Sequence, residues 1–377
     1  MIENLAEKVV NSQIKKPHLY IAVFIIITLV LLPGIFKLFN NVEPSLEKVL
    51  PGDIQEIQTM NYMRSQFGAD MIYLLVHTEN PVFDARNHNF LGYIDILSEK
   101  LRLRENIVSV NNAADLVKQS NQGILPDSTL QTKEIIKLNP LSSQYFDPNY
   151  QFSIIMVRSD TGASAEVITK VIDSINEDID SLETINPGSN IQLTGFNAID
   201  KATFEVMMMD FTKITLLSML LVTIVVLLTF KSFIKGFMPL TVVMFALIWT
   251  MGIIGYLNLT ITVVTMVAAA MILGLGIDFG IHVVHGYFEL RKSRTSRNAL
   301  KEIMRELLRA MIAASLTTVA GFLALLFGVL PAMKTLGIVL AIGILSTLVG
   351  AVVLLPVLIY LYDGKQIFGG KLKWLKQ

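Results

Sequence analysis

The pattern of apolar and polar positions divides the chain into six long apolar runs and one long segment that contains no such run. Because about 20 consecutive apolar residues cross a bilayer as a helix, each run predicts a membrane span. The predicted spans are 18–37, 212–230, 236–256, 262–288, 308–328 and 336–361. Residues 1–17 place Ile2, Leu5, Val9 and Val10 near one helical face. This spacing favours a short cytoplasmic interfacial helix over a frayed tail.

Residues 38–210 are predicted to form a domain outside the bilayer. Short apolar and alternating runs predict strands at about 71–78, 107–110, 152–158 and 191–194, helices at about 82–104 and 165–182, and a loop at 121–129. The order β-α-β then β-α-β is compatible with an α+β sandwich of the ferredoxin-like split βαβ type. A helical pattern that begins near Ala198 predicts one unbroken helix into the second span. The fold class expected is therefore an α-helical polytopic membrane protein with an extracytoplasmic α+β domain.

Composition agrees with an integral membrane protein, since 53% of the residues are hydrophobic and the mean hydropathy is +0.56. The formal net charge is zero, so bulk charge gives no sign of a nucleic-acid partner. The chain has no cysteine, which excludes disulfides, thiol catalysis and Cys-ligated zinc. The first apolar run is longer than a signal-peptide core and no small-residue cleavage site follows it, so it is expected to remain as a membrane anchor.

Charge is distributed unevenly along the chain. Residues 38–210 hold 12 Lys and Arg against 24 Asp and Glu, whereas the rest of the chain has an equal excess of basic residues. The basic residues concentrate between spans two and three, between spans four and five, and in the tail 362–377. By the positive-inside rule, both termini are predicted to be cytoplasmic and residues 38–210 extracytoplasmic, in a multi-pass protein of the cell membrane.

The fourth predicted span holds a carboxylate and two imidazoles. Asp278 lies near its middle, and His282 and His285 follow at i+4 and i+7, so the three share one helix face. An aspartate at a helix centre costs roughly 2.5–3.5 kcal/mol, and such residues commonly mark ion or proton pathways. Protonation removes this penalty and can change which neighbours the helix prefers, which is a two-state element suited to transport. The alternatives are a neutral, hydrogen-bonded Asp278, a structural His282 and an interfacial His285.

Small residues accompany these polar ones. Gly276 and Gly280 form a GxxxG pair on roughly the opposite face of the same helix. The fifth span carries a stripe of small residues at Ala310, Ala314, Thr317, Gly321, Ala324 and Gly328. We predict close helix packing at Gly274, Gly276, Gly280 and Gly321, and a hydroxyl near Asp278 from Thr317 or Thr318. Because threonine hydroxyls often bond to their own helix backbone, a structural role is the alternative.

Several blocks stand out together: Phe-Lys-Ser-Phe at 230–233, Trp-Thr-Met-Gly at 249–252, Gly-Leu-Gly-Ile-Asp-Phe-Gly-Ile-His at 274–282, and Val-Leu-Pro-Gly-Asp at 49–53. Their combination resembles the resistance–nodulation–division (RND) superfamily, in its MMPL-type branch of lipid and hydrophobe exporters. The resemblance implies proton-driven export of a hydrophobic or lipid substrate through a porter-like outer domain, without a cofactor. It also implies that Asp278 takes the proton and that His282 assists it.

Two features depart from that resemblance. Family members commonly have a tyrosine after the aspartate, where this chain has Phe279, so Thr317 or water is expected to replace the phenolic donor. They also carry two copies of the unit formed by the outer domain and its helices, where this chain carries one. A homodimer, or a higher homo-oligomer, is therefore expected to restore the two-copy arrangement.

Two other functions remain open on the sequence. The layout is also that of SecD and SecF, accessory subunits of protein export, although their fourth-span motifs look different. A lipid-binding regulatory module that resembles sterol-sensing domains would bind lipid without pumping it. Residues 38–210 show no nucleophile motif, P-loop or metal-spaced histidine cluster, which argues against an enzyme. The expected partners are thus the substrate, membrane lipids, protons and a second copy of the chain.

Overall fold

The computed structural model describes residues 2–39, 41–42, 49–67, 70–79, 84–161 and 165–368. These residues divide into two compact units. One unit consists mainly of residues 51–206, and the other of the N-terminal residues up to 42 and the residues from 207 onwards. The first residues of the helix predicted at 82–104 and the tail residues 369–377 lie outside the described residues.

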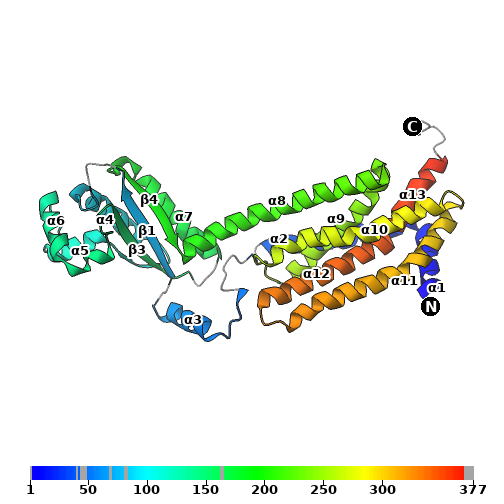
Figure 1. The fold of residues 1–377 in the computed structure, drawn as a ribbon, viewed down its shortest axis with the longest axis horizontal. Coiled ribbons are helices and arrows are strands. Elements are labelled where there is room, and N and C mark those ends of the chain that lie inside the picture. Colours follow the sequence, from blue (N-terminus) through cyan, green and yellow to red (C-terminus); the bar gives the residue numbers. More distant parts are fainter. Residues whose placement is uncertain are drawn as a thin grey trace. The chain divides into compact units, whose positions relative to one another are not determined.

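The unit of residues 51–206 is built on a four-stranded sheet (Figure 1). Its strands are β1 (Asp70–Thr78), β2 (Ile107–Asn111), β3 (Phe152–Ser159) and β4 (Ser189–Gly195), in the order β2-β3-β1-β4. Every neighbouring pair is antiparallel. Helices α4 (His88–Arg102) and α7 (Ala165–Ser181) connect β1 to β2 and β3 to β4. This is the order and direction of a split βαβ sandwich, so the predicted fold class is confirmed.

Alternating side chains explain why the sheet and its helices form one layer each. Ile72, Leu74 and Val76 of β1 are fully buried, whereas the residues between them are half-buried or exposed. The buried set packs with one face of α4 and one face of α7, including Ile94 and Ile175, in a single apolar core. Apolar residues recur every second residue on the strand and about every 3.6 residues on the helices, so each element turns one apolar face towards this core.

The connection between β2 and β3 contains structure that the sequence pattern did not predict. It holds α5 (Ala113–Ser120), α6 (Thr129–Leu138) and a short 3₁₀ turn at Pro140–Gln144. The loop predicted at 121–129 is present between α5 and α6. The helix predicted from 82 begins only at His88, because Asn87 caps it: its side chain accepts a hydrogen bond from the Asn89 amide. Helix α3 (Gln55–Phe67) precedes β1 and agrees with the sequence, in which a turn and cap at 50–53 lead into a roughly helical apolar spacing at Ile54, Ile57, Met60 and Phe67.

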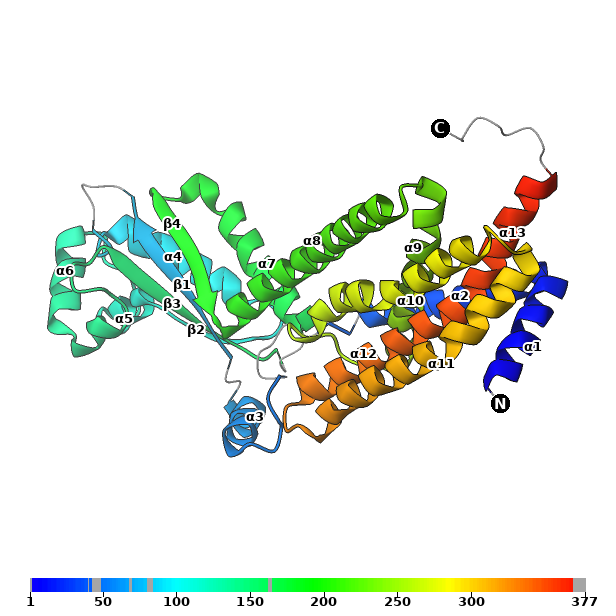
Figure 2. The same cartoon turned by 45° about the vertical axis from the view of Figure 1, so that its right-hand side comes forward.

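Among the described residues, six helices are long and apolar enough to cross a membrane, as predicted, and all of them except the first residues of α8 belong to the second unit. They are α2 (Pro17–Phe39), α8 (Phe196–Phe230), α9 (Phe233–Tyr256), α10 (Ala268–Leu290, after a 3₁₀ turn at Thr265–Val267), α11 (Ser296–Leu323, extended by a 3₁₀ turn at Ala324–Phe327), and α12 (Pro331–Val349) with its continuation α13 (Leu355–Phe368). Helix α8 is continuous over 35 residues, as the pattern after Ala198 predicted. Helices α10, α11 and α12 run side by side (Figure 2).

Helix α1 (Ile2–Lys15) occupies the region predicted as an interfacial helix. It packs against α11 and α13 and buries Ala6, Val10 and Gln13 almost completely. The polar Gln13 has a specific partner, because α12 and α13 are joined by a π-helical turn at Gly350–Leu354. The Gln13 Nε2 donates to the carbonyl of Val352 at 2.9 Å. A side chain from the other end of the chain therefore satisfies a carbonyl within this turn.

Candidate proton site on helix α10

One face of α10 packs closely against two neighbouring helices. A Cβ at Gly276 would lie 2.4 Å from the Thr347 Cγ2 of α12, and a Cβ at Gly280 would lie 2.9 Å from the Pro239 Cβ of α9. Both glycines are buried. Only residues without a side chain permit this approach, so the GxxxG pair fixes the rotation of α10 about its own axis.

Because of that rotation, the opposite face of α10 is open in the single chain. Asp278, His282 and His285 are all exposed. Among the residues that the structure describes, neither Asp278 nor His282 has a hydrogen-bond or ion-pair partner. The His285 Nε2 lies 4.0 Å from the Glu289 Oε2 one turn further on. The structure thus places the three predicted titratable residues on one face, and no described residue is a partner of the carboxylate at mid-helix.

The threonines of α11 are engaged with their own backbone. The Thr317 hydroxyl donates to the carbonyls of Ala313 and Ala314 at 3.1 and 2.9 Å. The Thr318 hydroxyl donates to the carbonyl of Ala314 at 2.9 Å. In this arrangement neither hydroxyl hydrogen is directed to Asp278, and within one chain both threonines follow the structural alternative.

The small-residue stripe of α11 is also open to the surroundings of the chain. All six of its residues are exposed: Ala310, Ala314, Thr317, Gly321, Ala324 and Gly328. A Cβ at Gly321 would meet nothing within 4 Å, and the same holds for Gly274 on α10. The four predicted packing glycines therefore fall into two groups: Gly276 and Gly280 pack within the chain, whereas Gly274 and Gly321 face outwards.

Phe279, where the resemblance leads us to expect a tyrosine, does not belong to the open face. It is half-buried and packs against Val319 of α11 and Ala341 and Ile344 of α12. Its ring thus lies against α11 and α12 and not on the exposed stripe. The replacement by phenylalanine therefore removes no donor from the open surface next to Asp278.

A buried polar cluster at the other end of α10 escaped the sequence analysis. Asp363, only 7% exposed, accepts hydrogen bonds on its Oδ2 from the Tyr287 hydroxyl at 3.0 Å and from the Arg291 Nε at 2.8 Å. The Tyr287 and Ser296 hydroxyls lie 2.9 Å apart. These groups tie α13 to α10 and to the start of α11. The only sequence signal was an acidic residue at the end of the last apolar run.

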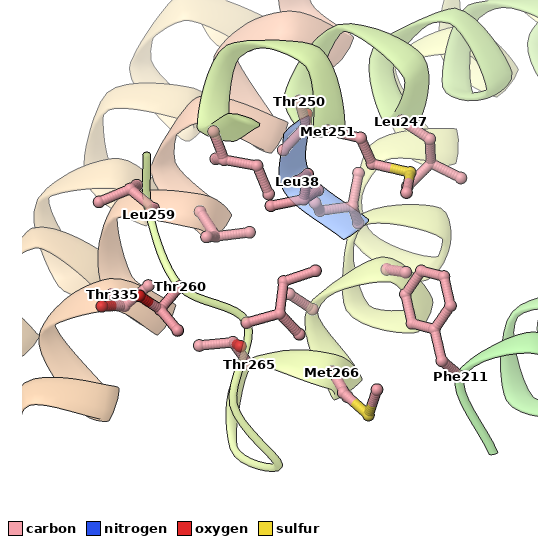
Figure 3. Close-up of a pocket in the computed structure, with 16 residues that line it drawn as sticks. Leu38, Phe211, Leu247, Thr250, Met251, Leu259, Thr260, Thr265, Met266 and Thr335 are labelled. Carbon is pink, nitrogen blue, oxygen red and sulfur yellow. The ribbon is translucent and has the colours of Figure 1, made fainter. Parts of the chain in front are cut away.

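An apolar cavity lies among α2, α8, α9, α10 and α12 (Figure 3). Its volume is about 40 Å³, and its lining includes Leu38, Phe211, Met251, Ile254 and Met266. The hydroxyl of Thr250 in its wall donates to the Ala246 carbonyl and is therefore not free to bind a ligand. A water needs roughly 10–15 Å³ by this measure, so the cavity has room for a few small groups but not for a lipid tail.

Two buried or half-buried carboxylates in the unit of residues 51–206 have their pKa lowered by ion pairs. Burial alone would raise the pKa of Asp84, but hydrogen bonds from Arg86 and Lys133 outweigh it and lower the pKa from 3.8 to about 2. Asp178 behaves alike: burial raises its pKa, and hydrogen bonds from Arg104 and Lys100 bring it below the usual range. Each carboxylate is held by two cations, which indicates structural pairs. Within the described ranges, no three His, Cys, Asp or Glu residues lie close enough to hold a metal ion.

The chain is similar in sequence to known membrane proteins. Residues 49–375 match the profile described as MMPL family. The chain is 31% identical over 372 residues to membrane protein MJ1562 of Methanocaldococcus jannaschii, a match that covers 96% of this chain and 95% of that one. It is 29% identical over 181 residues to membrane protein ActII-3 of Streptomyces coelicolor, which covers 46% of this chain and 25% of that one.

Proposed function

Since the chain belongs to the MMPL family, a family of RND-type exporters, we propose that it is a secondary transporter that exports a lipid or another hydrophobic molecule and is driven by protons. Asp278 takes up and releases the proton. In this proposal both termini are cytoplasmic, and the unit of residues 51–206 lies outside the cell membrane and guides the substrate. The strongly acidic 38–210 segment and the basic loops of the remaining chain support this orientation.

The observation that carries the proposal is the carboxylate of Asp278, which lies in the middle of a candidate membrane span and has no partner among the described residues. Asp278 is the eleventh residue of the 23-residue helix α10, so it cannot reach either bilayer surface by extending its side chain. An ionised aspartate at that depth is disfavoured by roughly 2.5–3.5 kcal/mol. The carboxyl group is therefore stable when protonated and disfavoured when ionised. A group that alternates between these two conditions couples proton binding to a change of contacts.

The second surface in this proposal is another copy of the chain. The open face of α10 and the exposed small-residue stripe of α11 are neighbours, because α10 and α11 pack together through Gly286 and Ile303. Small residues allow two helix backbones to approach closely in a membrane. A twofold axis beside α10 would bring the two Asp278 residues to the same depth and would bury both stripes. One chain then supplies half of the site and its copy the other half.

Transport in proteoliposomes tests the proposed function. The full chain is reconstituted, and movement of an NBD-labelled phospholipid between leaflets is followed with and without a proton gradient. We expect gradient-dependent movement that Asp278→Asn abolishes and that Asp127→Asn, an exposed position in the loop between α5 and α6, leaves intact. Full activity of Asp278→Asn would reject proton coupling through this residue. Lipid binding without movement in every variant would favour the regulatory module instead.

Cross-linking tests the second copy. The natural chain has no cysteine, so a single introduced cysteine reports only on its own position. A disulfide needs Cα atoms within roughly 7 Å of each other. We expect Gly274→Cys on α10 to form a covalent dimer in native membranes. The control is Leu221→Cys on α8, which is 54% exposed and lies outside the open face. Equal cross-linking at both positions, or none at Gly274→Cys, would argue against this interface.

A further inference from the structure

The open face of α10 changes character at Asp278. Towards the start of the helix it carries Val267, Met271 and Leu275, which are 45%, 37% and 42% exposed. Towards the end it carries His282, His285 and Glu289, all exposed. One face thus has an apolar half and a titratable half, and Asp278 stands at the border between them.

The titratable half is continuous. Asp278, His282, His285 and Glu289 follow one another at intervals of four, three and four residues, which keeps all four on one side of a helix. The rise between successive members is about 4.5–6 Å, and the whole series spans about 16 Å. Half the hydrocarbon thickness of a bilayer is about 15 Å. The series therefore reaches from mid-membrane to the surface at the basic end of α10.

We infer that protons reach Asp278 along a path that opens to one side of the membrane only. His282, His285 and Glu289 connect Asp278 to the side that holds the basic loop 291–309. Glu289 is the group that exchanges protons with water. The inference rests on the proposed role of Asp278 as the proton-carrying group. It adds three positioned residues and a side of access. The apolar half of the same face provides no such connection to the opposite side.

Each transfer along the path balances. The Asp278 carboxyl group gives its proton to the neutral His282 imidazole and becomes a carboxylate, while His282 becomes an imidazolium. His282 passes a proton to His285, which passes one to the Glu289 carboxylate across the observed 4.0 Å separation. Glu289 then releases it to water. Histidine suits the two middle positions because its charge changes near neutral pH and its two ring nitrogens can donate and accept.

Several charged groups lie near the end of the path. The Lys235 Nζ of α9 lies 4.2 Å from the centre of the Phe288 ring, and Arg291 pairs with Asp363 of α13. Arg294 lies just before α11 and pairs with Glu302 of that helix. Arg305, Glu306 and Arg309 of α11 line a separate wide surface groove together with Glu7 of α1. The ring of Phe230, at the end of α8, is the aromatic neighbour of His285 at 6.5 Å between centroids. Arg291 and Arg294 are thus held in ion pairs outside the path.

The inference is tested by following the protonation of Asp278 without any substrate. The full chain is placed in phosphatidylcholine–phosphatidylglycerol liposomes of known protein orientation, and the pH is lowered on one side only. Dicyclohexylcarbodiimide crosses the membrane and reacts with protonated carboxyl groups in apolar surroundings. Peptide mass spectrometry then gives the rate at which Asp278 is modified. The variants are Glu289→Gln with His285→Gln, the conservative Glu289→Asp, and the control Glu306→Gln at the same end of the neighbouring helix α11.

We expect modification of Asp278 to follow the pH on the basic-loop side. The double variant should respond roughly tenfold or more slowly, because a positioned proton-transfer group typically contributes at least that much. With equal pH on both sides, the final extent of Asp278 modification in the double variant should equal that of the natural chain. Glu289→Asp and Glu306→Gln should respond like the natural chain. A response to the opposite side, or an unchanged rate in the double variant, would overturn the path while leaving proton binding at Asp278 in place. An Asp278 that is never modified at any pH would overturn the proposed function and the path together.

Discussion

Replacing Gly276 by alanine tests the packing that turns Asp278 towards the open face. The new Cβ would lie 2.4 Å from the Cγ2 and 3.1 Å from the Cβ of Thr347. Thr347 is completely buried, and its hydroxyl donates to the Ile344 carbonyl at 2.8 Å. Because the side chain of a buried threonine in a helix has few alternative rotamers, it cannot turn away without losing this bond. Helix α12 must therefore move away from α10 by about 1 Å to reach ordinary contact distances.

The expected cost follows from two opposing effects. Overpacking of this kind costs about 1–3 kcal/mol, and alanine in place of glycine in a helix returns about 1 kcal/mol. Gly276→Ala should therefore destabilise the chain by about 0–2 kcal/mol. Gly274→Ala is the matched control, because it lies on the same helix and its Cβ would meet nothing within 4 Å. It should stabilise an isolated chain by up to about 1 kcal/mol.

A second substitution separates the steric effect from any general effect of alanine. Thr347→Ser removes the methyl group that the new Cβ would meet and keeps the hydroxyl. In a double-mutant cycle it should recover part of the loss caused by Gly276→Ala, with a coupling energy of about 0.5–3 kcal/mol. Denaturant unfolding in mixed micelles, at a dilution that keeps chains apart, measures all four stabilities. Equal stability of Gly276→Ala and Gly274→Ala, or no gain from Thr347→Ser, would refute the packing argument.

Three further predictions concern polar groups. Asp363→Leu leaves the Arg291 guanidinium without its partner and should lower the unfolding free energy of the micellar chain by roughly 2–3 kcal/mol, since Arg291 is still partly hydrated. Gln13→Leu removes the donor to the Val352 carbonyl and should cost about 1–3 kcal/mol by the same measurement, with faster amide hydrogen exchange around the π-helical turn. The folded pKa of Asp84 is about 2 and lies below its ordinary value of 3.8, so its ion pairs stabilise the protein above about pH 4 and lose this effect as the pH falls towards 2. Asp84→Asn should flatten the fall of the melting temperature in that window, and an unchanged profile would contradict it.

Local periodicity was sufficient to predict most elements of the fold. Strand β1 was expected at 71–78 and is Asp70–Thr78, and α7 was expected at 165–182 and is Ala165–Ser181. Each of these elements has one buried face, so its apolar residues recur at a regular spacing that the local sequence shows. The helices that the sequence did not predict, α5 and α6, are short, at 8 and 10 residues. A short helix shows too few turns for its period to stand out from the polar segment around it.

The side-chain partners of the membrane unit could not be predicted in the same way. Gln13 and Val352 are 339 residues apart in sequence, and Arg291 and Asp363 are 72 apart. Contacts between distant helices depend on how each helix is rotated, and rotation is set by close packing such as that of Gly280 on Pro239. The sequence predicted which residues of α10 share a face. It could not predict which of its two faces would be left open in the single chain.

The open face of α10 also suggests how proton release could move two α10 helices relative to each other. If two copies meet along α10, each Asp278 lies near the other across a twofold axis, at the same depth in the bilayer. Two like charges close together in a medium of low dielectric constant are strongly disfavoured, so such a pair is most stable when at least one carboxyl group holds a proton. Release of that proton along His282 and His285 would leave two facing carboxylates and would push the α10 helices apart. Gly274 and Leu275, on the apolar half of the same face, would move with them. An Asp278 with no partner among the described residues of its own chain therefore suits an interface between two copies that opens when the proton is released.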